Sequence, residues 1–320
     1  MSKEAYHTLC QTEDDIPIFS QDWWLDVVCG KANWEVCLII EQDSRIVGAL
    51  PVYIPCSRVI SMPSYTQTMG VWFAPSAGDA KYASVLEYRQ SICKRLIEQL
   101  KNYPCFFQNF HHSFTDWLPF YWAGFQQTTR YTYLLTNLKD MACLWEKMSQ
   151  QTRRSIKKAK EQFQITVKKG IPTDEFIRVQ SLTFERQGIK NKQSEAVLRE
   201  LIRVCRQRQQ GDLWGGYDQE GNLHAAVFVV YQKKTAYYLA GGGNPAFRNS
   251  GAHSLVLWEA IQEVADYSET FDFEGSMLPG VERFFREFGG TQMPYFTISR
   301  GKLSLADRAL MKLRKPVHSK

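Results

Sequence analysis

The sequence predicts a mixed α/β protein whose 320 residues form two domains, residues 1–136 and 137–320. Three observations support this prediction. The length suits two domains of about 150 residues each. Strand-like and helix-like segments are mixed along the chain in an order that is typical of α/β sheets. Finally, two features of the first half recur in the same order in the second half, which indicates an internal duplication.

The duplication rests on two pairs of segments. Residues 44–53 parallel residues 221–230, because both combine a polar start with a long apolar strand pattern. Residues 120–125 parallel residues 284–289, since both are aromatic and contain glycine. The second pair follows an aromatic strand at a similar distance in each half. The chain is therefore predicted to contain two α/β sheets side by side.

The elements of the first half follow from hydrophobic periodicity. A short amphipathic helix begins near Pro17, and an irregular connection rich in Pro, Ser and Thr covers residues 57–76. Residues 85–100 have the apolar spacing of a helix. The predicted strands are residues 34–40, 46–54, 106–110 and 131–135.

The second half is expected to begin with one long helix over residues 141–163. The other predicted helices are residues 176–186, 194–207 and 250–267. The predicted strands are residues 213–217, 223–231, 235–240, 270–274 and 295–300. Polar turns at residues 218–222 and 232–234 separate the first three of these strands.

Composition excludes several classes of protein. Hydrophobic residues make up 44% of the chain and charged residues 22%, as in ordinary soluble proteins. No apolar run reaches the roughly 20 residues of a membrane helix, and the N-terminus lacks the apolar core of a signal peptide, so a cytoplasmic location is expected. The eight cysteines have no metal-site spacing and are predicted to be reduced, with no metal bound.

A glycine-rich turn between a strand and a helix is the first candidate site. It spans residues 241–252 and contains Gly243, Arg248 and Gly251. Glycines let the backbone approach a ligand closely, and the N–H groups at the start of a helix suit a phosphate. Ser250 is a good residue to cap that helix. The turn is also compatible with a capped helix that binds nothing.

A pair of carboxylates follows on the next predicted strand. Asp272 and Glu274 are two residues apart, so a strand would place both side chains on one face. A carboxylate at a half-buried strand end can have a raised pKa and act as a base in acyl transfer. Glu274, nearest the strand end, is the preferred base. Either residue could instead bind only backbone N–H groups or an arginine.

These segments together resemble the FemAB-like branch of the GNAT acyltransferase superfamily. The order strand, Arg248-x-x-Gly251-Ala252 and helix is similar to the GNAT pyrophosphate loop. The stretch 271–290 and the basic helix from Arg153 extend the resemblance over most of the chain. It implies two tandem GNAT-like domains, each a mixed and mostly antiparallel sheet flanked by helices. Members of the branch use acyl or aminoacyl donors in cell-envelope pathways.

The chain departs from the family pattern at two positions. His253 occupies the third fixed position of the loop, where glycine or alanine is expected. Phe285 stands where aminoacyl-transferring members commonly carry lysine, and it also cannot act as the tyrosine that protonates a leaving thiolate in ordinary GNAT enzymes. Arg286, next to it, is the expected source of positive charge.

The resemblance implies an N- or O-acyltransferase that moves an acyl group from acyl-coenzyme A, with acetyl-coenzyme A as the simplest case, to an amine or hydroxyl of a cell-envelope or small-molecule acceptor. Glu274, Asp272 and Arg286 are the expected catalytic residues. The expected donor-binding residues are Gly243, Arg248, Asn249, Ser250, Gly251 and Ala252. Tyr238, Ser276 and Tyr121 are the expected acceptor-binding residues.

Two alternatives to this function remain open from the sequence. The protein could transfer an aminoacyl group from aminoacyl-tRNA to a peptidoglycan precursor, or it could bind an envelope precursor without catalysis. Five basic residues between Arg153 and Lys160 could contact tRNA phosphates, although a solvated helix face is the simpler interpretation. A second basic cluster between Arg308 and Lys320 could contact anionic lipid at a membrane surface.

Overall fold

The computed structural model describes residues 2–302 except 57, 77, 79 and 187–193. The chain divides into two compact units, Met1–Arg130 with Pro294–Lys320, and Tyr131–Met293. This division differs from the predicted one, because the last strand, from Pro294 on, returns to the first unit instead of completing the second. The basic cluster of residues 308–320 lies outside the described residues. Of the described helices, none has the length and apolar character needed to cross a membrane.

The first unit contains a sheet with the strand order β1-β2-β3-β5-β12, and β4 pairs with β2. Pairing is antiparallel except between β3 and β5. The strands are β1 (Trp34–Ile40), β2 (Ile46–Cys56), β3 (Val59–Ser61), β4 (Trp72–Phe73), β5 (Cys105–Phe110) and β12 (Thr291–Arg300). The helices are α1 (Ser2–Thr12), α2 (Asp22–Cys29), α3 (Tyr82–Gln99) and α4 (Leu118–Trp122).

Apolar spacing explains how α3 covers this sheet. Ile92, Cys93 and Leu96 recur at helical intervals and are buried in the core of the first unit. The helix lies so close to β2 that a Cβ at Gly48 would come within 2.4 Å of the Ile92 side chain. The strand therefore needs glycine at this position.

The second unit contains a sheet with the strand order β6-β11-β10-β9-β8-β7. Only the pairing of β10 with β11 is parallel among the described ladders of this unit. The strands are β6 (Gln126–Thr136), β7 (Thr166–Lys169), β8 (Gly211–Tyr217), β9 (Leu223–Tyr231), β10 (Thr235–Gly243) and β11 (Thr270–Asp272). The helices are α5 (Met141–Lys147), α6 (Gln150–Glu161), α7 (Thr173–Arg186), α8 (Glu195–Gln207), α9 (Ala252–Val264) and α10 (Pro279–Arg286).

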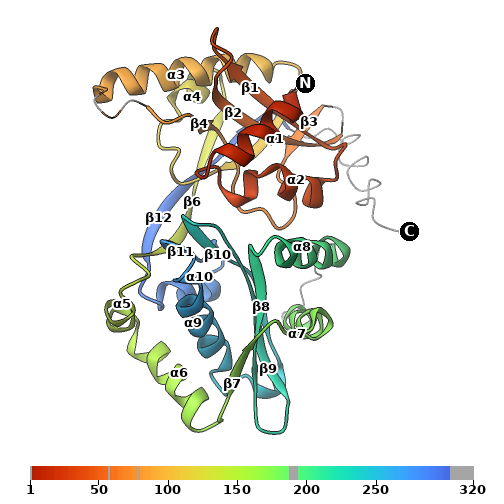
Figure 1. The fold of residues 1–320 in the computed structure, drawn as a ribbon, viewed down its shortest axis with the longest axis vertical. Coiled ribbons are helices and arrows are strands. Elements are labelled where there is room, and N and C mark those ends of the chain that lie inside the picture. Colours follow the sequence, from red (N-terminus) through yellow and green to blue (C-terminus); the bar gives the residue numbers. More distant parts are fainter. Residues whose placement is uncertain (1, 57, 77, 79, 187–193, 303–320) are drawn as a thin grey trace. The chain divides into compact units, whose positions relative to one another are not determined.

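Helices cover both faces of this second sheet (Figure 1), with α7 and α8 on one side and α9 on the other. Every residue of β9 is buried as a result. Val227 and Val229 pack with α9, whereas Phe228 meets Phe176 of α7. The uninterrupted apolar sequence of β9 thus reflects a strand that is covered on both faces. The predicted fold class, mixed α/β with mostly antiparallel sheets flanked by helices, is confirmed.

Several predicted elements have different bounds in the structure, and three of these differences concern the region around the site. The long helix predicted over residues 141–163 is two helices, because Ser149 caps α6 through Thr152 and its own N–H binds the carbonyl of Glu287. The helix predicted from Ser250 begins at Ala252. The strand predicted over residues 270–274 ends at Asp272, since Glu274 adopts a left-handed backbone conformation with φ of 60°.

The strand β10 contains a bulge beside the candidate site. Its pairing with β9 shifts between Tyr238 and Ala240, so that Leu239 is an extra residue. Tyr238 and Gly241, three residues apart, consequently face the same side, where a Cβ at Gly241 would lie 2.2 Å from the Tyr238 hydroxyl. A larger residue at this position would therefore have to displace the Tyr238 hydroxyl.

Candidate functional site

A pocket of about 1060 Å³ opens in the second unit where β10 and β11 part. The two parallel strands pair only as far as Tyr237 and Asp272. Beyond this point β10 continues to Gly243, while β11 gives way to a turn. The gap between the diverging ends is lined by the end of β10, the loop into α9, the turn after β11 and α10. Splayed strand ends are a common place for ligands in α/β sheets.

Most of the predicted site residues line this pocket. They are Tyr238, Gly243, Arg248, Ser250, Gly251, Ala252, Glu274 and Ser276. The structure places four others elsewhere: Asn249, Asp272, Arg286 and Tyr121. Local sequence order explains the first group, because a strand, a turn and the following helix start must lie close together.

The loop between β10 and α9 is held from behind by α6. Gly251 has a φ of 77°, and a Cβ there would lie 2.3 Å from the carbonyl oxygen of Ser155. Lys158 donates a hydrogen bond to the carbonyl of Asn249 at 2.8 Å. Asn249 thus serves to anchor the loop and does not line the pocket. The predicted glycine requirement at Gly251 comes from both its backbone conformation and this close contact.

The start of α9 differs from the predicted cap. Gly251 is the N-cap residue, and the Ser250 hydroxyl accepts a hydrogen bond from the N–H of Ala252 at 3.2 Å. The N–H of Ser254 donates to the carbonyl of Gly251. Two donors of the first turn are therefore already bound within the protein. Arg248, which is exposed and lines the pocket, supplies positive charge beside this helix end.

The two predicted carboxylates have separate surroundings. Asp272 is 1% exposed, and its Oδ1 accepts hydrogen bonds from the Thr132 hydroxyl and from the N–H of Glu274. Burial raises the pKa of Asp272 to about 7, although these two hydrogen bonds oppose the shift. Asp272 fixes the turn that carries Glu274 into the pocket. The expectation that both side chains share one strand face is wrong, because Glu274 lies beyond the strand.

Glu274 lies in the pocket wall beside Tyr238 and His253. Burial raises the pKa of Glu274 well above its usual range, and the neighbouring charge of Asp272 adds to the effect. Burial and the charge of Glu274 also raise the pKa of Tyr238, so its hydroxyl stays protonated. That hydroxyl lies 3.1 Å from Nε2 of His253. His253, which replaces the small residue of the family loop, therefore contributes a polar group to the pocket.

Arg286 and Tyr121 do not reach the pocket. Arg286 lies on the outer side of α10, 60% exposed, and its Nε is 3.0 Å from Oε1 of Glu282. The expected role of Arg286 in stabilising charge at the reaction centre is therefore corrected. Tyr121 belongs to α4 of the first unit, is 59% exposed and packs edge-on against Trp117.

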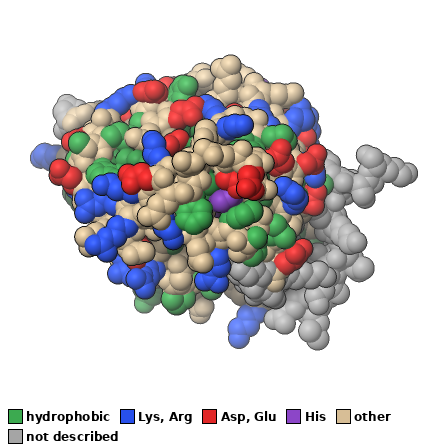
Figure 2. Space-filling model, turned by 90° about the horizontal axis from the view of Figure 1, so that it is seen from below, with side chains coloured by type: hydrophobic (Ala, Val, Ile, Leu, Met, Phe, Trp, Pro, Cys, Tyr) green, Lys and Arg blue, Asp and Glu red, His purple; other side chains and the backbone are tan. Residues whose placement is uncertain are grey.

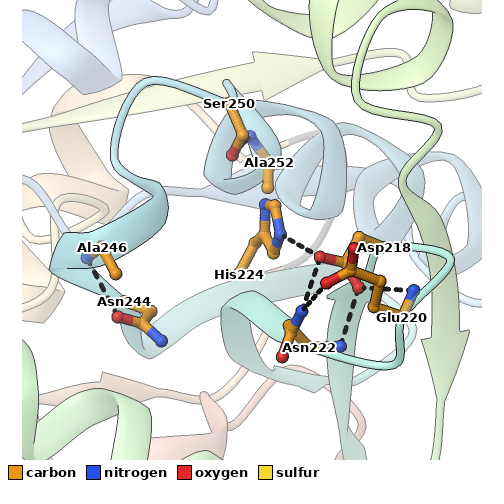
Figure 3. Close-up of polar contacts among 8 residues, drawn as sticks. All are labelled: Asp218, Glu220, Asn222, His224, Asn244, Ala246, Ser250 and Ala252. Carbon is orange, nitrogen blue, oxygen red and sulfur yellow. Dashed lines mark hydrogen bonds and ion pairs between the residues drawn. The ribbon is translucent and has the colours of Figure 1, made fainter.

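A histidine that the sequence did not single out supports the loop from the other side (Figure 3). His224 is 3% exposed, and its Nε2 lies 3.0 Å from Oδ2 of Asp218. Asp218 also accepts hydrogen bonds from the N–H groups of Glu220 and Asn222 and from the Asn222 side chain. The hydrogen bonds from the Asn222 side chain, from its backbone N–H and from His224 lower the pKa of Asp218 to about 2.

The ring of His224 stacks on Phe247, with centroids 4.0 Å apart and planes at 1°. Asp218 fixes His224, and His224 in turn fixes the short helical turn η2 (Pro245–Phe247) that precedes Arg248. On α7, Thr183 accepts a hydrogen bond from the N–H of Gly243 at 3.0 Å. Nothing in the local sequence indicates the His224–Phe247 and Thr183–Gly243 contacts, because each joins elements that are far apart along the chain.

Comparisons with known proteins agree with this fold. The family model for the acetyltransferase (GNAT) domain matches residues 146–286. The solved structure of FemX is similar with a TM-score of 0.66 and 12% identity, and the match covers 98% of each chain. No curated protein shows significant sequence similarity to the chain.

Two further solved structures share the fold. One is the C-terminal domain of a putative lysylphosphatidylglycerol synthetase from Agrobacterium fabrum, with a TM-score of 0.56 and 11% identity over 98% of this chain and 95% of that one. The other is a conserved protein of unknown function from Bacteroides thetaiotaomicron, with a TM-score of 0.54 and 10% identity over 94% and 97%. The identities are low, so these matches show the fold alone.

Proposed function

Because residues 146–286 belong to the acetyltransferase (GNAT) domain family and the chain has the fold of FemX, we propose that the protein transfers an acyl group from acyl-coenzyme A to an amine or hydroxyl acceptor. The observation that carries the proposal is the pocket at the parting of β10 and β11. It brings the start of α9, Arg248 and Glu274 to one cavity. A cytoplasmic location and a cell-envelope or small-molecule acceptor complete the proposal.

The donor phosphates lie at the polar end of the pocket in this proposal. Arg248 supplies a cation there, and the positive end of the α9 dipole favours an anion. Gly243, Ser250, Gly251 and Ala252 line the same end. The His224–Phe247 stack and the Lys158–Asn249 hydrogen bond hold this loop in place. A pre-formed loop lowers the entropic cost of donor binding.

Glu274 is the proposed proton acceptor. The acceptor nitrogen or oxygen attacks the thioester carbon and loses its proton to the Glu274 carboxylate, directly or through a water. The carbon–sulfur bond then breaks, and the leaving thiolate takes a proton from the Tyr238 hydroxyl. Glu274 then returns its proton to the deprotonated Tyr238, directly or by exchange through solvent, which restores both groups. Arg286 has no part in this scheme because it pairs with Glu282 outside the pocket.

The donor proposal is tested by titrating the full chain with coenzyme A and acetyl-coenzyme A in a calorimeter. We expect binding to both, with Arg248→Ala weakening it about tenfold or more, since a charge-assisted contact to phosphate is lost. Arg203→Ala is the matched control, because Arg203 is an exposed arginine of α8 paired with Glu200. If neither coenzyme A species binds, the donor assignment is wrong.

The role of Glu274 is tested once turnover is measured. Glu274→Gln should lower kcat by about 100-fold or more and leave donor affinity unchanged, as general-base contributions are of this size. Because the pKa of Glu274 is raised, kcat of the wild type should increase with pH as the carboxylate ionises, and the variant should lose this dependence. A protein that only binds an envelope precursor would show ligand binding without turnover.

Transfer from aminoacyl-tRNA is the second candidate, and the basic helix α6 favours it. In the described part of the chain no ion pair involves Arg153, Arg154 or Lys157. Figure 2 shows Lys and Arg side chains gathered on the side of the lower face where α6 lies in Figure 1. RNA retained on purification and released by salt would support this candidate, because phosphate contacts weaken steeply with salt.

A further inference from the structure

The helix α10 presents only apolar side chains to the pocket. Val281, Phe284 and Phe285 line the cavity, as does Leu278 just before the helix. The charged residues of α10 are engaged elsewhere, in the ion pairs Arg283–Glu287 and Arg286–Glu282. The amphipathic pattern of this helix therefore directs every charge away from the cavity.

The apolar surface continues from α10 to the sheet. Phe285 packs on Phe273 with ring centroids 5.4 Å apart and on Tyr238 at 5.5 Å. Phe284 lies 5.3 Å from the ring of His253. Phe273 and Phe285 are buried and form a fixed wall. The polar end with Arg248 and this apolar wall belong to one continuous pocket of about 1060 Å³.

The mouth of the pocket is also apolar at this end. Leu278 is 58% exposed, and the adjacent Met277 is 56% exposed. Large exposed apolar side chains beside an apolar cavity are typical of surfaces that a ligand covers. Leu278 is the N-cap residue of α10 and Phe285 lies seven residues further on, a separation of about 10 Å along the helix axis at 1.5 Å per residue. An acetyl group is too short to span this distance.

We propose that the apolar wall formed by Phe273, Phe284 and Phe285 holds a hydrocarbon group of several carbons. The substrate then carries a medium-chain or aromatic group instead of only an acetyl group. This inference rests on the proposed acyl transfer at the same site. The hydrocarbon belongs either to the acyl chain of the donor or to the acceptor. Both sources share the same chemistry, because the wall offers packing contacts and excludes water.

The donor source is tested by calorimetric titration with acetyl-, butyryl-, hexanoyl- and octanoyl-coenzyme A. Each buried methylene should tighten binding by up to about fourfold until the wall is covered. Phe284→Ser should flatten this series, measured as the affinity of each longer donor relative to acetyl-coenzyme A in the same variant. Leu278→Ser is the second variant, and its exposed position makes it safe for folding. Arg283→Ser, on the outer side of the same helix, should keep the full dependence on chain length.

The acceptor source is tested with ethylamine, hexylamine and phenethylamine in the presence of coenzyme A. Tighter binding of the two larger amines, lost in Leu278→Ser, would assign the hydrocarbon to the acceptor. If affinity does not change with the size of the hydrocarbon in either series, the inference is wrong, whereas binding of coenzyme A would still support the proposed donor. If no coenzyme A species binds, the proposed donor is wrong. The amine series, measured without coenzyme A, then tests the inference alone. Equal affinities for the three amines would overturn it.

Discussion

Asp272 accepts hydrogen bonds from Thr132 and from the backbone of Glu274 at the end of β11, so this buried carboxyl shapes the turn that carries the proposed base. The sequence analysis assigned both carboxylates to the site and predicted that their side chains lie on the same face of the strand. The left-handed conformation of Glu274 separates them. The turn also passes close to β6, since a Cβ at the next residue, Gly275, would lie 2.0 Å from the Tyr131 carbonyl oxygen. Such a contact between a turn and a strand far apart in the sequence has no local sequence signal.

Asp272→Asn should reduce the dependence of stability on pH. The usual pKa of an aspartate is about 4, and burial raises that of Asp272 to about 7. Between these values the folded protein keeps a proton that the unfolded chain releases, so the free energy of unfolding falls as pH rises. The asparagine oxygen can still accept both hydrogen bonds. Urea unfolding across this pH window should show a smaller fall in the variant, and an equal fall would contradict the assignment.

Regular elements with strong periodicity are predictable from the sequence, whereas elements set by tertiary contacts are not. The strand β9 has the predicted bounds, because its apolar run is long and flanked by turns. The helix α10 was not predicted, since it has only eight residues and its apolar face is defined by the pocket. The break between α5 and α6 depends on the hydrogen bond from Ser149 to Glu287, which is distant in sequence.

Gly251→Ala should displace the loop that α6 holds. A left-handed backbone costs a non-glycine residue about 1–2 kcal/mol, and the new Cβ would lie 2.3 Å from the Ser155 carbonyl oxygen. We expect a lower melting temperature together with weaker binding of coenzyme A. Gly280→Ala is the control for stability, because a Cβ there has open space and alanine favours the helix. Equal melting temperatures for the two variants would show that α6 does not constrain the loop.

At the scale of the whole molecule, every residue that lines the pocket belongs to the second unit, Tyr131–Met293. The duplicated segments do occupy matching places, since α4 lies between β5 and β6 in the chain as α10 lies between β11 and β12. One of the two segment pairs of the predicted repeat thus has the same neighbouring elements in both halves. The sequence could not show that α10 carries a pocket wall, because that depends on the divergence of β10 and β11.

Tyr121→Ala should leave the affinity for coenzyme A unchanged. Tyr121 lies on α4 in the first unit, largely exposed, and does not line the pocket. The same calorimetric titration used for Arg248→Ala measures the effect, and a melting curve checks that the variant is folded. A loss of about tenfold in affinity would mean that the first unit contributes to donor binding.

Because of the extra residue in β10, the number of residues in this strand determines which of them face the pocket. Since side chains alternate along a strand, the bulge at Leu239 decides that Gly241 and Gly243, and not Gly242, follow Tyr238 on the same face. Loss of one residue here would straighten the ladder with β9 and exchange the two faces of the strand end. A single codon deletion at Leu239 would thus remove this pocket, although all the other residues that line it would still be encoded.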